Sequence, residues 1–332
     1  MVQYEYIHDD TVMPKEFAVM IGVGLKPFDI DVKREKTIEE THAFKIDYEI
    51  KDLEADFGKL KKSPSGYGFD GAVSQKAFIE DILGDLMPVK LAFSPSCSMA
   101  QIIYNIMGLE TMMLSMYDCP ELFHKMMQMI TDDYMELWDT TEKNGYIREN
   151  NFNVCVPQGS YGFTNELPVN KTGANLSMGD VWGYMDSQET SEISPGMYHE
   201  FFFPYYKKIS GRFGRFNYGC CEGVSKIWEK SVSKYENLSK VSISQWCDEE
   251  YMGDCLRGKK IVYHRKPFPN YLGVDKEFDE KAFSGHIEKS LKAAKGCFFE
   301  ISYRDVYSLQ GDLYRCKKAY EVIKKCIDKF WE

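Results

Sequence analysis

Two adjacent cysteines followed by a glutamate form the segment of this sequence with the most potential for chemistry. The run Tyr218-Gly219-Cys220-Cys221-Glu222 ends a short apolar stretch, residues 215–218, that is typical of a β-strand. Strand ends that open into a helix are where α/β proteins place binding and catalytic groups. A thiolate at such a position is a nucleophile or a zinc ligand. We therefore expect Cys220 and Cys221 to bind a metal, with a tightly packed turn as the alternative.

Polar or aromatic side chains also follow the other predicted strands. Because the carboxyl ends of parallel strands meet at one face, residues distant in the sequence converge there. The predicted catalytic residues are Asp186, Tyr218 and His264. The predicted substrate-binding residues are Gln188, Gln245, Asp248, Lys266, Arg304 and Tyr161.

Several of these residues have a structural interpretation as well. Asp186 and Asp248 could be helix N-caps, and His264 could bond a neighbouring backbone carbonyl. Arg304 could pair with Asp305 at the point where a barrel closes. Each alternative stays open at the level of sequence.

The elements that must position these side chains alternate along the chain. Short apolar runs bounded by Gly, Pro or polar residues predict strands at 90–93, 152–156, 181–185, 215–218, 240–244, 260–264 and 297–303. Helical patterns lie between them. One begins with Asp118 as the N-cap before Pro120 and stops at Asn144-Gly145, and another begins at Ser194-Pro195.

This alternation predicts an α/β fold, specifically a (β/α)8 TIM barrel. Seven β/α steps, preceded by a buried strand within residues 17–24, suit a closed parallel barrel better than an open sheet. Residues 1–85 are irregular and are expected to form an N-terminal arm packed on the barrel. Residues 86–332 are expected to form the main part of the single barrel domain, because no linker or repeat divides them.

Composition limits the partners and the compartment. The formal net charge of −10 gives no electrostatic support for a nucleic-acid or anionic-membrane partner. The apolar run at residues 17–24 is too short for a signal peptide or a membrane span, so we expect a cytoplasmic protein with ten reduced cysteines. Its 43 Tyr and Phe residues (22 + 21) permit a homodimer interface.

Three blocks resemble the uroporphyrinogen decarboxylase superfamily. Residues 182–206, with Ser194-Pro195 and Pro204, are similar to its "iSPe…ef..P" block. Ala92-Phe-Ser-Pro95, with residues 107–110 and 117–124, is similar to its "GP…G.e…dPe.vh" block, and residues 264–272 look like its "KPnP..l" variant. The resemblance runs from about residue 88 to the end.

The resemblance implies a (β/α)8 barrel and one of two activities. The first is decarboxylation of uroporphyrinogen, but the arginine-rich N-terminal motif of that branch is absent here. The second is methyl transfer between a methyl donor, a corrinoid-carrying protein and a thiol. That branch holds zinc with a His-x-Cys motif, which corresponds to Tyr218-Gly219-Cys220, and with a later cysteine, which is absent near residues 301–304.

We therefore expect a methyltransferase-like barrel that moves a methyl group between a small methylated compound or thiol and a corrinoid-binding protein. Its zinc would be held by Cys220 and Cys221, with His264 and either Glu222 or Asp186 as further candidate ligands. One alternative is a decarboxylase or lyase acting on a small acid through Arg304, Lys266 and His264. The other is a metal-free binding barrel, in which Tyr218 only donates a hydrogen bond.

Overall fold

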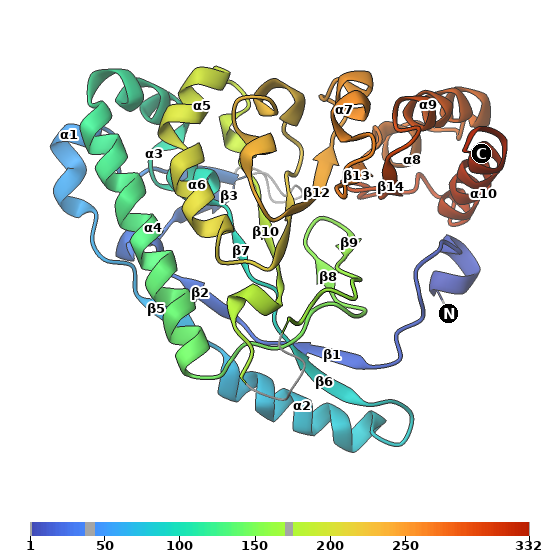
Figure 1. Ribbon diagram of the computed structural model, residues 1–332, viewed down its shortest axis with the longest axis horizontal. Helices are drawn as coiled ribbons and strands as arrows, with labels where there is room; N and C mark the ends of the chain where they lie inside the picture. Colours follow the sequence, from blue (N-terminus) through green and yellow to red (C-terminus); the bar gives the residue numbers. More distant parts are fainter. Residues whose placement is uncertain (1, 37–43, 170–174, 332) are drawn as a thin grey trace.

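A six-stranded parallel sheet forms the centre of the molecule (Figure 1). The computed structural model describes residues 2–36, 44–169 and 175–331. The strand order is β14-β13-β12-β11-β10-β7, and every pair in it is parallel. The strands are β7 (Ser96–Cys97), β10 (Trp182–Met185), β11 (Arg215–Tyr218), β12 (Leu238–Ile243), β13 (Val262–Arg265) and β14 (Phe298–Ile301). The predicted α/β class is confirmed.

A second parallel pair extends this sheet at one edge. Strand β1 (Phe17–Met20) pairs with β6 (Val89–Ala92), and only residues 93–95 separate β6 from β7. Within the described ranges no ladder joins β14 back to β1. The strands are therefore not closed into a hydrogen-bonded ring there.

The two faces of the sheet differ in chemistry because side chains alternate along each strand. On β12, Val241 and Ile243 belong to the hydrophobic core, whereas Lys240 and Ser242 point to the opposite face. We call the apolar side the outer face. The inner face carries Asn217, Lys240, Ser242 and His264.

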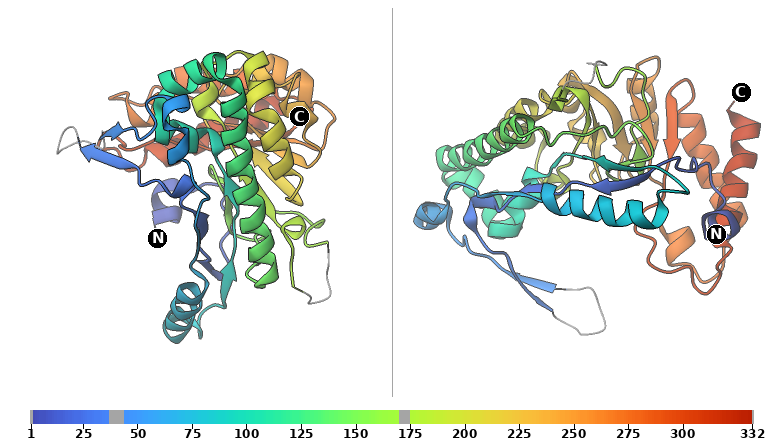
Figure 2. Two further views of the ribbon diagram at one scale, coloured as in Figure 1. Left: turned by 90° about the vertical axis from the view of Figure 1, so that its left-hand side faces the viewer. Right: turned by 90° about the horizontal axis from the view of Figure 1, so that it is seen from below.

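Helices cover the outer face (Figures 1 and 2). They are α3 (Met99–Asp118), α4 (Pro120–Lys143), α5 (Pro195–Phe201), α6 (Phe203–Ser210), α7 (Glu249–Leu256), α8 (Asn270–Gly273), α9 (Glu280–Ala293) and α10 (Arg315–Phe330). Ser194 caps α5 as predicted, its Oγ accepting from Met197 N at 3.2 Å. The predicted Asp118 cap of α4 is wrong: Asp118 ends α3, and Cys119 takes the cap position. No helix in the described residues is long and apolar enough to cross a membrane.

A short hairpin, rather than a barrel strand, occupies the predicted strand 152–156. Strand β8 (Cys155–Val156) pairs antiparallel with β9 (Ser160–Tyr161), outside the large sheet. The prediction was wrong because the chain reverses at once after Val156, with Gln158 and Gly159 at φ of 82° and 81°. Lys240 Nζ anchors the hairpin to the inner face by donating to Ser160 Oγ and to Tyr161 O, both at 2.6 Å.

The N-terminal region surrounds the β1–β6 edge and reaches the C-terminal helix. It contains β2 (Val23–Leu25) paired with β5 (Ser65–Tyr67), β3 (Lys33–Lys36) paired with β4 (Phe44–Asp47), α1 (Leu53–Asp56) and α2 (Phe69–Leu83). Before β1, a helical turn at Gln3–Ile7 lies beside α10 (Figure 2). Tyr320 Oη of α10 donates to Asp10 Oδ1 at 2.8 Å.

Candidate active site

A cavity of about 380 Å³ lies at the carboxyl ends of β7, β10 and β11, which is where parallel α/β sheets bind ligands. The β8–β9 hairpin and the segment after β14 complete its wall. Its lining residues are Ser96, Ser98, Gln101, Pro157, Gln158, Tyr184, Asp186, Gln188, Cys220, Cys221, Arg304 and Asp305.

The thiol turn, residues 219–222, presents both cysteines to this cavity. Gly219 has φ of 98°, and a Cβ there would lie 3.2 Å from Ser242 Cβ and from Val224 Cγ2, so glycine is required. The Glu222 carboxylate then accepts from Cys220 N at 2.7 Å and from Ser187 N at 3.0 Å. It thereby ties the end of β11 to the end of β10.

Cys220 is set up to ionise near neutral pH. Its Sγ lies 3.5 Å from Cys221 Sγ and 3.5 Å from Arg304 Nη1, and its thiol can donate to Gln158 Oε1 at 3.3 Å. The hydrogen bond from Cys221, helped by Lys266 and Arg304, lowers the pKa of Cys220 to about 6 against the opposing effect of burial. The same hydrogen bond, together with burial, raises the pKa of Cys221. The pair therefore holds one thiolate and one thiol donor.

Two buried charged groups hold the thiol turn: Lys266, which lies behind it, and Glu222, which belongs to it. Lys266 Nζ donates to the backbone carbonyl of Cys220 at 3.2 Å and to that of Gly219 at 3.4 Å. Burial lowers the pKa of Lys266. Burial, with a contribution from Asp186, raises the pKa of Glu222 to about 7. These groups fix the turn and surround its thiolate with opposing charges.

Asp186 lines the cavity on the β10 side. The carboxylate is oriented by Tyr184 Oη, which donates to Asp186 Oδ2 at 2.7 Å. Asp186 is only 6% exposed, and its Oδ1 is buried with no hydrogen-bond partner among the described residues. A buried carboxylate oxygen without a donor is costly, so the site lacks one partner.

Five of the predicted site residues meet at the cavity: Asp186, Gln188, Cys220, Cys221 and Arg304. Lys266 lies behind them, against the backbone of the thiol turn. These positions agree with the convergence of strand ends. The roles proposed for the residues stay predictions.

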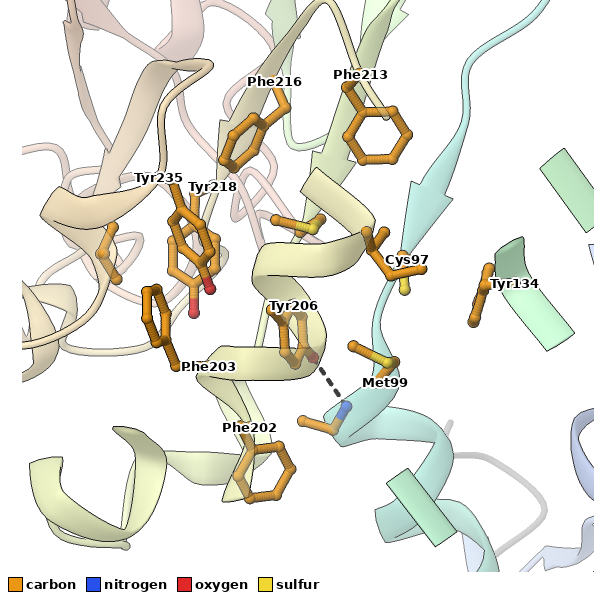
Figure 3. Close-up of a cluster of buried hydrophobic side chains, with 14 of the residues drawn as sticks. Cys97, Met99, Tyr134, Phe202, Phe203, Tyr206, Phe213, Phe216, Tyr218 and Tyr235 are labelled. Carbon is orange, nitrogen blue, oxygen red and sulfur yellow. Dashed lines mark hydrogen bonds between the residues drawn. The ribbon is translucent and has the colours of Figure 1, made fainter. Parts of the chain in front are cut away.

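Tyr218 faces away from the cavity. It follows Asn217, which points to the inner face, so Tyr218 points to the outer face and into the aromatic core (Figure 3). Its hydroxyl lies 2.6 Å from Tyr198 Oη and 2.6 Å from Ser187 Oγ, and burial raises the pKa of Tyr218.

The other four predicted residues lie outside the cavity lining. His264 is buried deeper on the inner face, with Nε2 2.6 Å from Ser302 Oγ, and burial lowers its pKa well below the usual value. Asp248 caps α7 by accepting from Tyr251 N at 3.0 Å. Tyr161 stacks on Phe163 in the hairpin segment, and the buried Gln245 Oε1 has no partner among the described atoms.

Sequence reasoning missed several lining residues. Gln158 reaches Cys220 only because the hairpin is folded onto the inner face. The Pro157-Gln158-Gly159 run was a readable turn signal, but it does not say where the turn packs. Ser96 lies in β7, and Ser98 and Gln101 follow it as the other polar residues follow their strands, so the strand-end argument applied to these two as well.

The arrangement does not fit the expected zinc. Within the described part of the chain, no group of three or more His, Cys, Asp or Glu side chains could hold a metal ion. Catalytic zinc sites use three protein ligands. Here Tyr218, at the expected histidine position, points to the outer face, and His264 bonds Ser302. We derive no chemistry through zinc.

Comparison with known proteins bears on the fold. No protein-family model and no curated protein match the sequence. Solved structures do match, among them a methyltransferase from Methanosarcina mazei with a TM-score of 0.52 and 10% identity, over 91% of this chain and 76% of that chain. At this identity the likeness shows a shared fold alone.

Proposed function

We propose that this protein is a methyltransferase that moves a methyl group between a small methylated compound or thiol and a corrinoid-binding protein, with Cys220 as the nucleophile. The observation that carries the proposal is a thiolate-forming cysteine in an open polar cavity at the carboxyl end of the sheet. The fold shared with a methyltransferase agrees with it.

The residues of the cavity supply what methyl transfer needs. A thiolate attacks a methyl carbon in line with the leaving group, so that an S–C bond forms as the bond to the leaving group breaks. Cys221 and Arg304 hold Cys220 in its thiolate form. When bound, the corrinoid of a partner protein supplies a cobalt centre that exchanges methyl groups. Asp305 is exposed at the cavity wall, so a partner can approach from solvent.

We further propose that the fold is an opened (β/α)8 barrel of the uroporphyrinogen decarboxylase superfamily. In chain order β1, β6 with β7, β8, β10, β11, β12, β13 and β14 take the places of eight barrel strands. The third of these, β8, is turned into the hairpin. Two features support this assignment: the parallel pairing of the other strands and the sequence blocks from residue 88 onward.

Label transfer tests the function. The protein is incubated without oxygen, first with [13C]methylcobalamin and then with 13C-methylated thioethers and amines, and intact and peptide masses are measured. We expect one labelled methyl on Cys220, its absence in Cys220→Ser, and its retention in Cys316→Ser, which changes a cysteine on α10 outside the cavity lining. The absence of label on Cys220 with every donor would contradict the proposal.

A decarboxylase or lyase of a small acid is the second candidate. Arg304 favours it, because this guanidinium lines the cavity and can bind a substrate carboxylate. Release of CO2 from small acids without methyl transfer would select this candidate. Ligand binding with neither reaction would select the binding barrel.

A further inference from the structure

Two charged groups on the cavity wall have unused hydrogen-bonding capacity. The first is Asp186, 6% exposed, whose Oδ1 has no partner among the described residues. Its other oxygen is already held by Tyr184 Oη. A donor that completes this carboxylate has to come from the cavity that Asp186 lines, and a cationic N–H donor would also compensate its charge.

The second group is the Arg304 guanidinium. A guanidinium carries five N–H donors in a planar fork that suits a carboxylate. Among the described residues, the hydrogen bond from Nη1 to Cys220 Sγ at 3.5 Å is the one that Arg304 makes. The rest of the fork is available to an anionic group of a ligand.

Cys220 lines the same cavity as these two groups. Its Sγ touches Arg304, and the preceding Gly219 carbonyl lies 3.5 Å from the Tyr184 hydroxyl that orients Asp186. We therefore expect a ligand that binds both charges to lie beside the Cys220 thiol. The Gln158 amide beside Cys220 adds a neutral polar contact.

We propose that the cavity binds an N-methylated amino acid, whose protonated methylammonium group donates to Asp186 and whose carboxylate binds Arg304. The proposal rests on the proposed function and names the substrate class of the same site. Binding in this orientation brings the N-methyl group to Cys220.

The charges make this donor suitable for methyl transfer. The Cys220 thiolate forms an S–CH3 bond while the C–N bond breaks, and the electron pair of the C–N bond stays on nitrogen. The ammonium nitrogen then leaves as a neutral amine, so no oxidant or reductant is needed. Asp186 stabilises the cationic form of the amine, which is the form with a good leaving group.

Calorimetric titration of the full chain tests the substrate class. We expect N,N-dimethylglycine to bind at least tenfold more tightly than dimethylammonium, which offers only the cation, or acetate, which offers only the anion. Trimethylglycine should bind more weakly than N,N-dimethylglycine because it has no N–H. Equal affinity for N,N-dimethylglycine and for either dimethylammonium or acetate would overturn the proposal. This comparison uses the unmodified protein, so misfolding of a variant cannot affect it.

Two substitutions assign the ends of the ligand. Asp186→Asn should weaken N,N-dimethylglycine binding at least tenfold and leave acetate binding unchanged. Arg304→Gln should weaken the binding of N,N-dimethylglycine and acetate but not of dimethylammonium. The matched controls Glu250→Gln and Lys289→Gln remove exposed charges on α7 and α9 and should change none of these affinities. Unchanged zwitterion binding in folded Asp186→Asn would overturn the proposal.

The outcomes also separate this inference from the proposed function. If the zwitterion binds in the expected pattern but no methyl group appears on Cys220, the substrate-class assignment holds and methyl transfer fails. If Cys220 is methylated by neutral donors alone and the zwitterion does not bind, methyl transfer holds and the substrate class is wrong.

Discussion

Charged groups in two regions of the molecule, the outer face around Arg265 and the cavity wall, differ in how completely they are hydrogen-bonded. On the outer face Arg265, 1% exposed, donates to Glu249 Oε1, Ser290 Oγ and Ile243 O, each at 2.9 Å. Ser290 Oγ in turn donates to Glu249 Oε2 at 2.5 Å. This arginine clamp joins β13 to α7 and α9. At the cavity, by contrast, Asp186 Oδ1 has no partner among the described residues and Arg304 uses one donor.

The difference separates groups that stabilise the fold from groups that we propose bind a ligand. A buried ion pair with every donor and acceptor matched is what folding alone requires. Asn217 Oδ1 and His264 Nδ1, both on the inner face, are also buried without partners in the described structure. Within the same described part of the chain, buried unpartnered atoms also occur on the covering helices, among them Trp138 Nε1, His286 Nε2 and Arg315 Nε. What distinguishes the cavity is that the unpartnered Asp186 oxygen belongs to a charged side chain that lines a space large enough for a ligand.

The largest effect should come from breaking the arginine clamp. Glu249→Ala leaves the Arg265 guanidinium buried without its counter-ion, so the free energy of unfolding should fall by about 3–5 kcal/mol. Urea denaturation measures it. Glu250→Gln, at the adjacent exposed position, should change it by less than about 0.5 kcal/mol. A loss below about 1 kcal/mol for Glu249→Ala would remove the contrast between the arginine clamp and the cavity.

The cavity should show the opposite pattern, with activity lost and stability kept. If Cys220 is the nucleophile, as proposed, Cys220→Ala removes it, so the rate of the proposed methyl transfer should fall at least about 100-fold, or ~2.7 kcal/mol in the barrier. Because Cys220 is outside the tightly packed outer-face core, the free energy of unfolding measured at pH 5.5, where the thiol is mostly protonated, should change by less than about 1 kcal/mol. Rate assays and urea denaturation are run on the same preparation, and unchanged transfer would assign Cys220 to the scaffold.

The pH dependence of Cys220 reactivity sharpens the comparison further. With a pKa of about 6, Cys220 should be half-maximally alkylated by iodoacetamide near pH 6, and faster above it as the thiolate fraction rises. Cys221→Ala removes the hydrogen bond that lowers this pKa, so alkylation at pH 6 should slow by about tenfold for each unit of upward shift. A midpoint above pH 8 in the unmodified chain would contradict the thiolate assignment.

The same pKa gives a stability signature. Since folding lowers the Cys220 pKa from 9.0 to about 6, the thiolate favours the folded state. This contribution is complete above about pH 9 and is lost as the pH falls through 6. The stability advantage over Cys220→Ala should therefore shrink between pH 9 and pH 5.5 in urea denaturation.

The smallest effect is expected for Asp248→Ala, which tests whether Asp248 serves the fold or the candidate site. Its carboxylate caps α7, so Asp248→Ala should lower the free energy of unfolding by about 1 kcal/mol through the lost cap. Methyl transfer should be unchanged, because Asp248 is outside the cavity lining. A tenfold loss of activity without loss of stability would return Asp248 to the site.

Sequence patterns predicted the repeating elements and the edge of the sheet that carries the site. Short apolar runs identified β10 to β14, because these strands are bounded by turns and separated by helices. Asp186, Cys220 and Arg304 were placed together because parallel strands end at one edge. These conclusions need only local pattern and the handedness of the fold.

Side-chain direction and long-range packing could not be predicted in the same way. Tyr218 was assigned to the site, but a one-residue difference in strand phase turns it to the outer face. The position of the β8–β9 hairpin depends on Lys240 of β12, which is distant in sequence and donates a hydrogen bond to Ser160 of the hairpin. Gln158 enters the site only through that contact.

The β8–β9 hairpin contributes to the cavity wall without being part of the main sheet. Pro157 and Gln158 form part of the cavity wall, yet the segment from β8 to β9 lies outside the ladders of the main sheet. Its attachment relies on side chains of the inner face, chiefly Lys240 and Asn217. The sequence of the β8–β9 hairpin can therefore change, and with it the shape of the cavity wall, while the strands of the main sheet and the thiol turn stay in place.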